Sequence, residues 1–149
     1  MLDALSPLVR GLFGALLVAC LASCASLGGP PKTLTDADRA ELVERVTARW
    51  EALERKDFAA TWDFATPAYR AVFPRDYHAR NFTYTVDWEL TAVEVLAYDA
   101  DAAVASVAVR VMSRPTKQTA VSAQFGAIPT TVREKWVSID GEWWHSVSG

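Results

Sequence analysis

The side chains best suited to proton transfer in this chain are His78, His145 and an aspartate close to the first of them, Asp76. An imidazole can act as general acid or base near neutral pH, and a carboxylate can share that work. Asp76 with His78, or His145 alone, is therefore the candidate catalytic group. Each also has a plainer interpretation, as a surface residue of a short helix or a histidine packed on a sheet.

Other reaction types find little support in the sequence. The two cysteines, Cys20 and Cys24, both lie near the N-terminus, so the rest of the chain offers no thiol nucleophile, disulfide or zinc knot. We see no Ser-His-Asp spacing, no metal-ligand cluster and no glycine-rich phosphate loop, so we expect no metal and no cofactor. The net charge is −3 and the basic residues alternate with acidic ones, which argues against nucleic acid as a partner.

Aromatic residues are abundant, with six Trp, four Tyr and six Phe. Most such rings belong to a core, but some of them line pockets for small apolar molecules. Tyr69-Arg70 could also bind an anion, although a packing tyrosine beside a surface arginine is the plainer interpretation. The predicted ligand pocket contains Trp50, Trp62, Tyr69, Phe73, Trp88, Trp136 and His145.

The N-terminal stretch ends in Leu21-Ala22-Ser23-Cys24 and resembles the lipobox of bacterial lipoproteins. An apolar run of about ten residues precedes it, which is short for a permanent membrane span. The resemblance implies that residues 1–23 are a signal peptide and that Cys24 carries the lipid, including palmitate-type acyl chains. It also implies an envelope protein anchored in the outer membrane and facing the periplasm, because Ala25, not Asp, follows the cysteine. An ordinary secretory signal or an uncleaved anchor is the alternative.

Residues 24–33 are rich in Gly and Pro and are expected to form a flexible tether. The pattern after it predicts helices. Thr35 and Asp38 have the spacing of a capping box, Asp57 is expected to cap a second helix, and Thr66-Pro67 is typical of a third helix start. The apolar face of the first helix is expected to consist of Val43, Val46, Trp50 and Leu53.

From Phe82 onward, apolar and polar residues alternate, which predicts strands. The apolar phase shifts by one residue after Leu90, which predicts a β-bulge near residues 91–92. A tight turn is expected at Asp99, and a further strand over residues 119–125. Asp140-Gly141 is the strongest hairpin signal.

A two-residue turn at Asp140-Gly141 would place Trp136, Trp143 and His145 on one face of the sheet and Trp144 on the other. Both faces would then carry rings and need cover. We expect a helix to cover one face, and a homodimer through the outer face is one way to cover the other.

The stretch from Arg49 to Arg70 and the closing hairpin from Trp136 to Trp144 resemble the start and end of NTF2-like (SnoaL-like, cystatin-like) domains. The resemblance covers residues 34–149. It implies an α+β cone, in which a long N-terminal helix and short helices pack on a curved antiparallel sheet of four or five strands. The family includes isomerases, dehydratases, hydrolases and binding modules, so the fold alone does not assign an activity.

Three hypotheses for function follow. The first is a lipid-anchored envelope protein whose domain binds a small apolar ligand or a protein partner without catalysis. The second is a small enzyme using His145, or Asp76 with His78, although residues 66–73 lack the acid that ketosteroid-isomerase relatives place there. The third is a structural assembly subunit, for which an exposed apolar face carrying Trp144 would be the sign.

Overall fold

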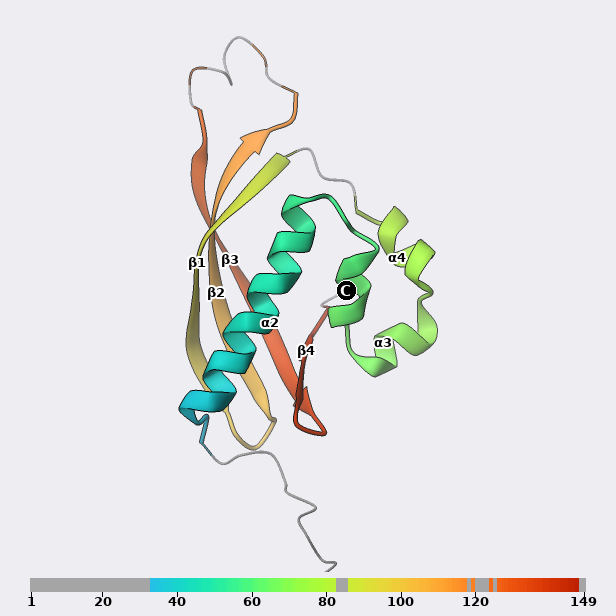
Figure 1. Ribbon diagram of the computed structural model, residues 1–149, viewed down its shortest axis with the longest axis vertical. Coiled ribbons are helices and arrows are strands. Elements are labelled where there is room, and N and C mark those ends of the chain that lie inside the picture. Colours follow the sequence, from blue (N-terminus) through green and yellow to red (C-terminus); the bar gives the residue numbers. More distant parts are fainter. Residues whose placement is uncertain (1–32, 83–85, 118, 120–123, 125, 148–149) are drawn as a thin grey trace, which may run out of the picture.

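A computed structural model describes residues 33–82, 86–117, 119, 124 and 126–147. The predicted signal peptide, Cys24 and almost the whole predicted tether lie outside the described residues. The model confirms the α+β class (Figure 1). Its elements are α2 (Asp36–Glu54), the 3-10 helix η2 (Ala60–Phe64), α3 (Pro67–Val72), α4 (Arg75–Arg80), β1 (Val86–Asp99), β2 (Val104–Pro115), β3 (Ile128–Ile139) and β4 (Glu142–His145). Among the described helices, none combines the length and apolar character needed to cross a membrane.

Helix α2 begins with the predicted capping box. Thr35 Oγ1 accepts a hydrogen bond from the Asp38 backbone N–H, and the Asp38 carboxylate accepts one from the Thr35 backbone N–H. Its buried residues differ from the predicted apolar stripe in two respects: Leu42 is buried in place of Val43, and a charged residue lies among them. They are Leu42, Val46, Arg49, Trp50, Ala52 and Leu53.

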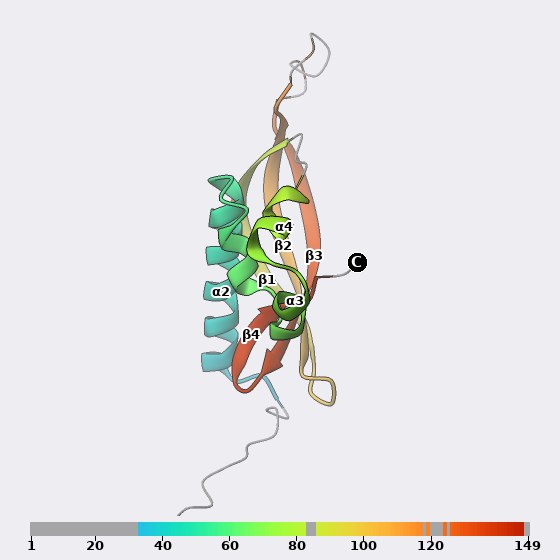
Figure 2. The same ribbon diagram turned by 90° about the vertical axis from the view of Figure 1, so that its right-hand side faces the viewer.

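The sheet is antiparallel, with strand order β1-β2-β3-β4. Figure 2 shows α2 lying along one face of it. The predicted bulge is confirmed, because the register of β1 against β2 shifts between Leu90 and Ala92. A second shift, between Val95 and Ala97, was not predicted. The Glu54 carboxylate accepts a hydrogen bond from the Leu90 backbone N–H, which ties the end of α2 to the first bulge.

The predicted hairpin between β3 and β4 is also confirmed. Ile139 pairs with Glu142 and Trp136 pairs with His145. Asp140 and Gly141 both have positive φ, at 54° and 82°, as a type I′ turn requires. The predicted strand at residues 119–125 lies mostly outside the described residues.

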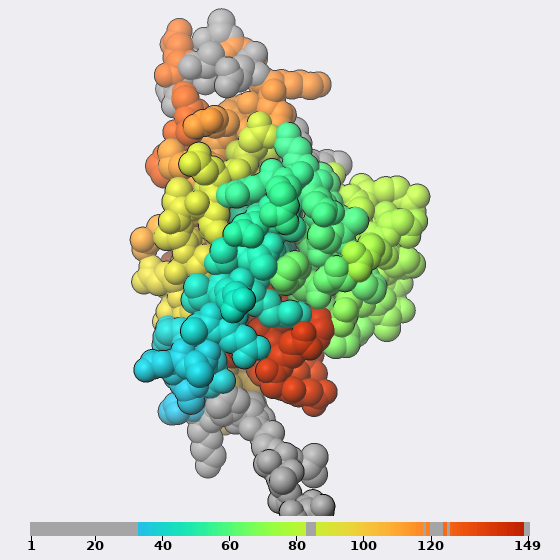
Figure 3. Space-filling model, viewed as in Figure 1, coloured from blue at the N-terminus to red at the C-terminus, as the bar shows by residue number. Residues whose placement is uncertain are grey.

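Strand β4 packs between α2 and the short helices, as Figure 3 shows in red, cyan and green. Trp144 is only 7% exposed, because the guanidinium groups of Arg45 and Arg70 lie over its ring at 4.8 and 4.4 Å from the centroid. Trp144 therefore does not supply the exposed apolar face expected from the sequence. Arginines of the same chain cover it, and the homodimer stays a prediction without this support.

The core lies between α2 and the inner face of the sheet. Trp136 is fully buried at its centre, among residues that alternate along β2 and those of the α2 stripe. The buried core cluster comprises Leu42, Val46, Trp50, Leu53, Ala105, Val107, Val109, Val111, Trp136 and Trp143. Into this apolar layer the fold also brings one carboxylate and one guanidinium.

Candidate functional site

A buried carboxylate, Glu134 on β3, is the polar centre of this layer. The side chain of Arg49 donates to its Oε1 at 2.7 Å, and the indole N–H of Trp50 donates to the same oxygen at 3.0 Å. The indole N–H of Trp136 donates to Oε2 at 2.9 Å. Three N–H donors from α2 and β3 therefore hold a side chain that is 5% exposed, which is how a buried charge is tolerated.

Arg49 differs from Glu134 in how many of its hydrogen-bonding groups are used. The residue is 8% exposed, yet only its Nη1 makes a hydrogen bond or an ion pair within the described part of the chain. Its Nε and Nη2 carry three further N–H groups on the outer edge of the guanidinium. Glu134 therefore accepts from three donors, whereas three of the N–H groups of Arg49 are unused among the described residues.

His145 on β4 stands beside this pair. Its Nε2 lies 3.9 Å from Oε1 of Glu134, beyond hydrogen-bond distance, and its ring meets that of Trp136 edge-on at 5.5 Å. Burial, and next the positive charge of Arg49, lower the pKa of His145 to about 3. At neutral pH the imidazole is therefore uncharged and presents one donor and one acceptor nitrogen.

These residues line a cavity of about 600 Å³. Its apolar wall comes from α2 and the sheet, including Trp50, Leu53 and Trp88, and its polar wall includes Arg49, Glu134 and His145. Successive residues of β3 from Val132 to Lys135 all line it. Neighbouring residues in a strand point to opposite faces of the sheet, so residues on both faces of β3 line the cavity. The cavity therefore continues around the edge of β3, over the part before Trp136 that does not pair with β4.

The second predicted histidine lies elsewhere. His78 on α4 is 5% exposed, and its Nε2 lies 2.9 Å from Thr61 Oγ1 and its Nδ1 3.0 Å from the Tyr69 hydroxyl. Thr61 donates its own proton to the Phe58 carbonyl, so it must accept from Nε2–H, which leaves Nδ1 to accept from Tyr69. This network suits a neutral imidazole, and burial lowers the pKa of His78 in the same direction. Its groups connect η2, α3 and α4.

The predicted pairing of Asp76 with His78 is wrong. The Asp76 side chain is 72% exposed and its Oδ2 lies 2.9 Å from Arg80 Nη2, one helical turn away on α4. Residues two apart on a helix point in different directions, so His78 faces inward and Asp76 faces outward. Asp76 therefore does not join His78 in a pocket.

The predicted ligand pocket is divided by the fold. Trp50, Trp88 and His145 line the cavity, and Trp136 lies fully buried behind Glu134. Trp62, Tyr69 and Phe73 do not line it, which corrects their assignment. Four contacts place these rings among the short helices: the Trp62 indole donates to the Phe73 carbonyl, Tyr69 packs on Phe73, and Arg70 and Arg75 each lie over Trp62.

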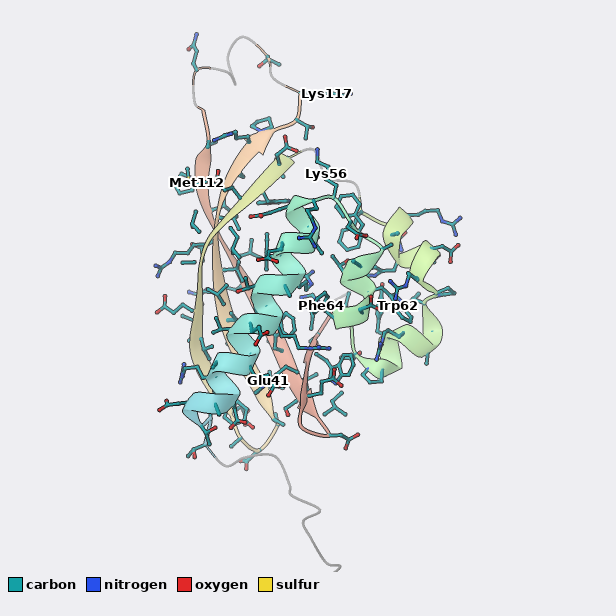
Figure 4. All side chains as sticks on the ribbon, in the orientation of Figure 1. Glu41, Lys56, Trp62, Phe64, Met112 and Lys117 are labelled. Carbon is teal, nitrogen blue, oxygen red and sulfur yellow. The ribbon has the colours of Figure 1, made fainter. Side chains whose placement is uncertain are left out.

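Figure 4 makes the same division visible on η2. Phe64 points toward α2, whereas Trp62 points toward α3 and α4.

Within the described residues, no three His, Cys, Asp or Glu side chains come together as a metal site.

The residues that sequence reasoning missed are Arg49 and Glu134 as a pair, 85 positions apart. Each carried a signal. Arg49 falls on the same helical face as Val46, Trp50 and Leu53, and Glu134 has the same strand parity as Trp136. A charge on an apolar face is the informative exception in a pattern of this kind.

The titration of His145 gives a testable pH dependence. Its folded pKa lies well below the ordinary value of 6.5, so the unfolded chain binds the extra proton between about pH 6.5 and 3. The stabilisation is therefore complete above pH 6.5 and is lost as the pH falls. We expect His145→Gln to remove a slope that approaches about 1.4 kcal/mol per pH unit below pH 6.

Urea unfolding of both proteins at pH 7.5, 6.5 and 5.5 measures this slope. The difference between them should change with pH in that window. Two curves that run parallel would show that His145 titrates normally in the folded protein.

Comparisons with known proteins give only a distant likeness. No protein-family model matches the chain, and no curated protein matches its sequence. One similar solved structure is that of a SEC-C motif containing protein from Rhodopseudomonas palustris, with 15% identity and a TM-score of 0.42. The match covers 69% of this chain and 73% of that one.

Proposed function

We propose that this protein is a lipid-anchored envelope protein whose NTF2-like, cone-shaped domain binds a small, largely apolar ligand in the cavity beside α2. In this proposal Cys24 carries the lipid, residues 24–33 form the tether, and the domain works at the periplasmic face of the outer membrane. The proposal makes the domain a binding module, not an enzyme.

The cavity is the observation that carries the proposal. About 600 Å³ is within the range of small-molecule sites, which are typically apolar with a few converging polar groups. The indoles of Trp50 and Trp88, 5.8 Å apart and edge-on, give it a rigid aromatic wall. Arg49, Glu134 and His145 supply polar groups at fixed positions.

Native mass spectrometry of the protein purified from membranes tests both parts of the proposal. We expect a bound small molecule at one per chain, and a mature chain that begins at Cys24 with its acyl chains attached. A protein with no bound molecule, even after incubation with membrane extracts, would contradict the binding role. Retention of residues 1–23 or an unmodified Cys24 would contradict the anchor.

An enzyme that uses His145 is the second candidate, and one observation favours it: His145 and Glu134 converge on the cavity, with Nε2 and Oε1 3.9 Å apart. Two features favour the binding role over it. First, the N–H groups of Arg49, Trp50 and Trp136 that contact Glu134 already donate hydrogen bonds to it. Second, a histidine with a pKa of about 3 is a weak base at neutral pH.

Incubating the purified protein with the molecule found by mass spectrometry separates the two candidates. We expect the molecule to be recovered unchanged, and His145→Ala to alter its affinity by no more than about tenfold, a packing-sized effect. Conversion by the unsubstituted protein that disappears in a folded His145→Ala variant would instead establish the enzyme.

A further inference from the structure

We infer that the ligand of this cavity carries a carboxylate on an apolar body, and that the free edge of the Arg49 guanidinium binds that carboxylate. The inference rests on the proposed binding role and adds the chemical class of the ligand. The observations that support it are the unused donors of Arg49, the three donors that already hold Glu134 and the charge of the cavity wall.

Two nitrogen atoms of the Arg49 guanidinium have unused N–H groups. The Arg49 side chain is 10% exposed, and Arg49 is one of the residues that line the cavity. Its Nη1 is committed to Glu134, while Nε and Nη2 make no hydrogen bond within the described residues, so they are open to water or to a ligand that accepts from them. The Nε–Nη2 edge is the one that binds a carboxylate through two parallel hydrogen bonds.

Glu134 fixes this geometry without competing for the ligand. Its two oxygens accept from Arg49, Trp50 and Trp136, and these contacts hold the guanidinium to β3. A cationic ligand would have to share the Glu134 carboxylate with the three donors that already hold it, and it would lie beside the positive charge of Arg49. The site therefore favours a ligand that brings an acceptor.

The charge of the cavity wall agrees with this. Arg133 and Lys135 are exposed and line the part of the cavity that continues around the edge of β3, and Glu134 is the one carboxylate among the lining residues, so these residues carry a formal charge of +2. Neither Arg133 nor Lys135 forms an ion pair with another described residue. The whole chain has a net charge of −3, so the positive cavity is a local arrangement.

The apolar part of the ligand has a matching surface. Trp50, Leu53, Trp88 and Val132 offer rings and branched side chains on the same cavity. An anion without an apolar body would leave that surface in water, so inorganic anions fit the site less well than an apolar acid.

Three probes with one bicyclic body test the inference: 2-naphthoate, 2-naphthalenemethanol and 2-naphthylmethylamine. Each is titrated calorimetrically into the full chain in lipid nanodiscs, with empty nanodiscs as the blank for partitioning. We expect 2-naphthoate to bind about tenfold or more tightly than the alcohol, and the amine to bind most weakly.

Variants then locate the effect. Arg49→Gln should weaken the binding of 2-naphthoate by about tenfold or more and change the affinity for the alcohol by no more than about twofold. Arg55→Gln, at the exposed end of the same helix, is the matched control and should change neither affinity. Arg49→Lys keeps a cation beside Glu134 and serves if the glutamine variant does not fold. The ranking of the probes on the unsubstituted protein needs no variant at all.

The outcomes separate the two claims. Equal binding of acid and alcohol, or binding of the acid that is indifferent to Arg49, overturns the carboxylate inference and leaves the cavity as an apolar binding site. Failure of all three probes to bind overturns the inference and the proposed function together.

Discussion

Replacing Glu134 by alanine is expected to lower the free energy of unfolding by about 3–5 kcal/mol, the range for removing one partner of a buried ion pair. The loss is large because Arg49 would stay buried with its charge unpaired, and the indoles of Trp50 and Trp136 would lose their acceptor. Small domains are stable by only about 5–15 kcal/mol, so the variant should be near the limit of folding. Chemical denaturation followed by far-UV circular dichroism measures the change.

Glu142→Ala provides the matched control. Glu142 also pairs with an arginine of α2, Arg45, at 3.1 Å, but its side chain is half exposed. Exposed ion pairs contribute about 0–1 kcal/mol, so the control should cost no more than that. If the two alanine variants lose similar stability, Glu134 is not the buried polar centre described above.

The second large effect is expected at Trp136. Trp136→Ala should cost about 3–5 kcal/mol, because it opens a cavity in the centre of the core. Trp136→Phe keeps most of the ring and removes the N–H that donates to Glu134, so it should cost about 1.5–3 kcal/mol, the range for a bond to a charged group. The same denaturation experiment measures both.

Trp62→Phe is the control for the hydrogen bond. The Trp62 indole donates to the neutral carbonyl of Phe73 at 2.7 Å, so its loss should cost only about 0.5–1.5 kcal/mol. If Trp136→Phe lowers the free energy of unfolding by less than Trp62→Phe does, the assigned role of Glu134 as a charged acceptor is contradicted.

Local signals predicted the local structure well. The cap at Thr35, the N-terminal proline of α3, the register shift after Leu90 and the turn at Asp140 all depend on residues within a few positions of one another. Side-chain chemistry of that range can be read directly from a sequence. The second bulge, at Leu96, interrupts an apolar run in which the alternation gives no sign of it.

The candidate site depends on contacts between residues far apart in the chain, which local sequence patterns do not predict. Glu134 meets Arg49 only because α2 packs on the face of the sheet to which Glu134 points, and Trp62 lies outside the cavity because it packs against α3 and α4. Of the rings predicted to line one pocket, Trp50 and Trp136 are buried and the others are partly exposed, and the sequence could not divide them between two clusters. The charges at positions 49 and 134, each on an apolar face, were the available sign of a polar centre.

Binding of a ligand in the cavity between α2 and the sheet should change the six indole N–H signals of the protein selectively. In a two-dimensional ¹⁵N NMR titration with 2-naphthoate, we expect the signals of Trp50 and Trp88 to shift, because both line the cavity. Those of Trp62 and Trp144, which arginines cover and which do not line the cavity, should shift less. Shifts confined to Trp62 and Trp144, or no shift at any concentration, would contradict the account.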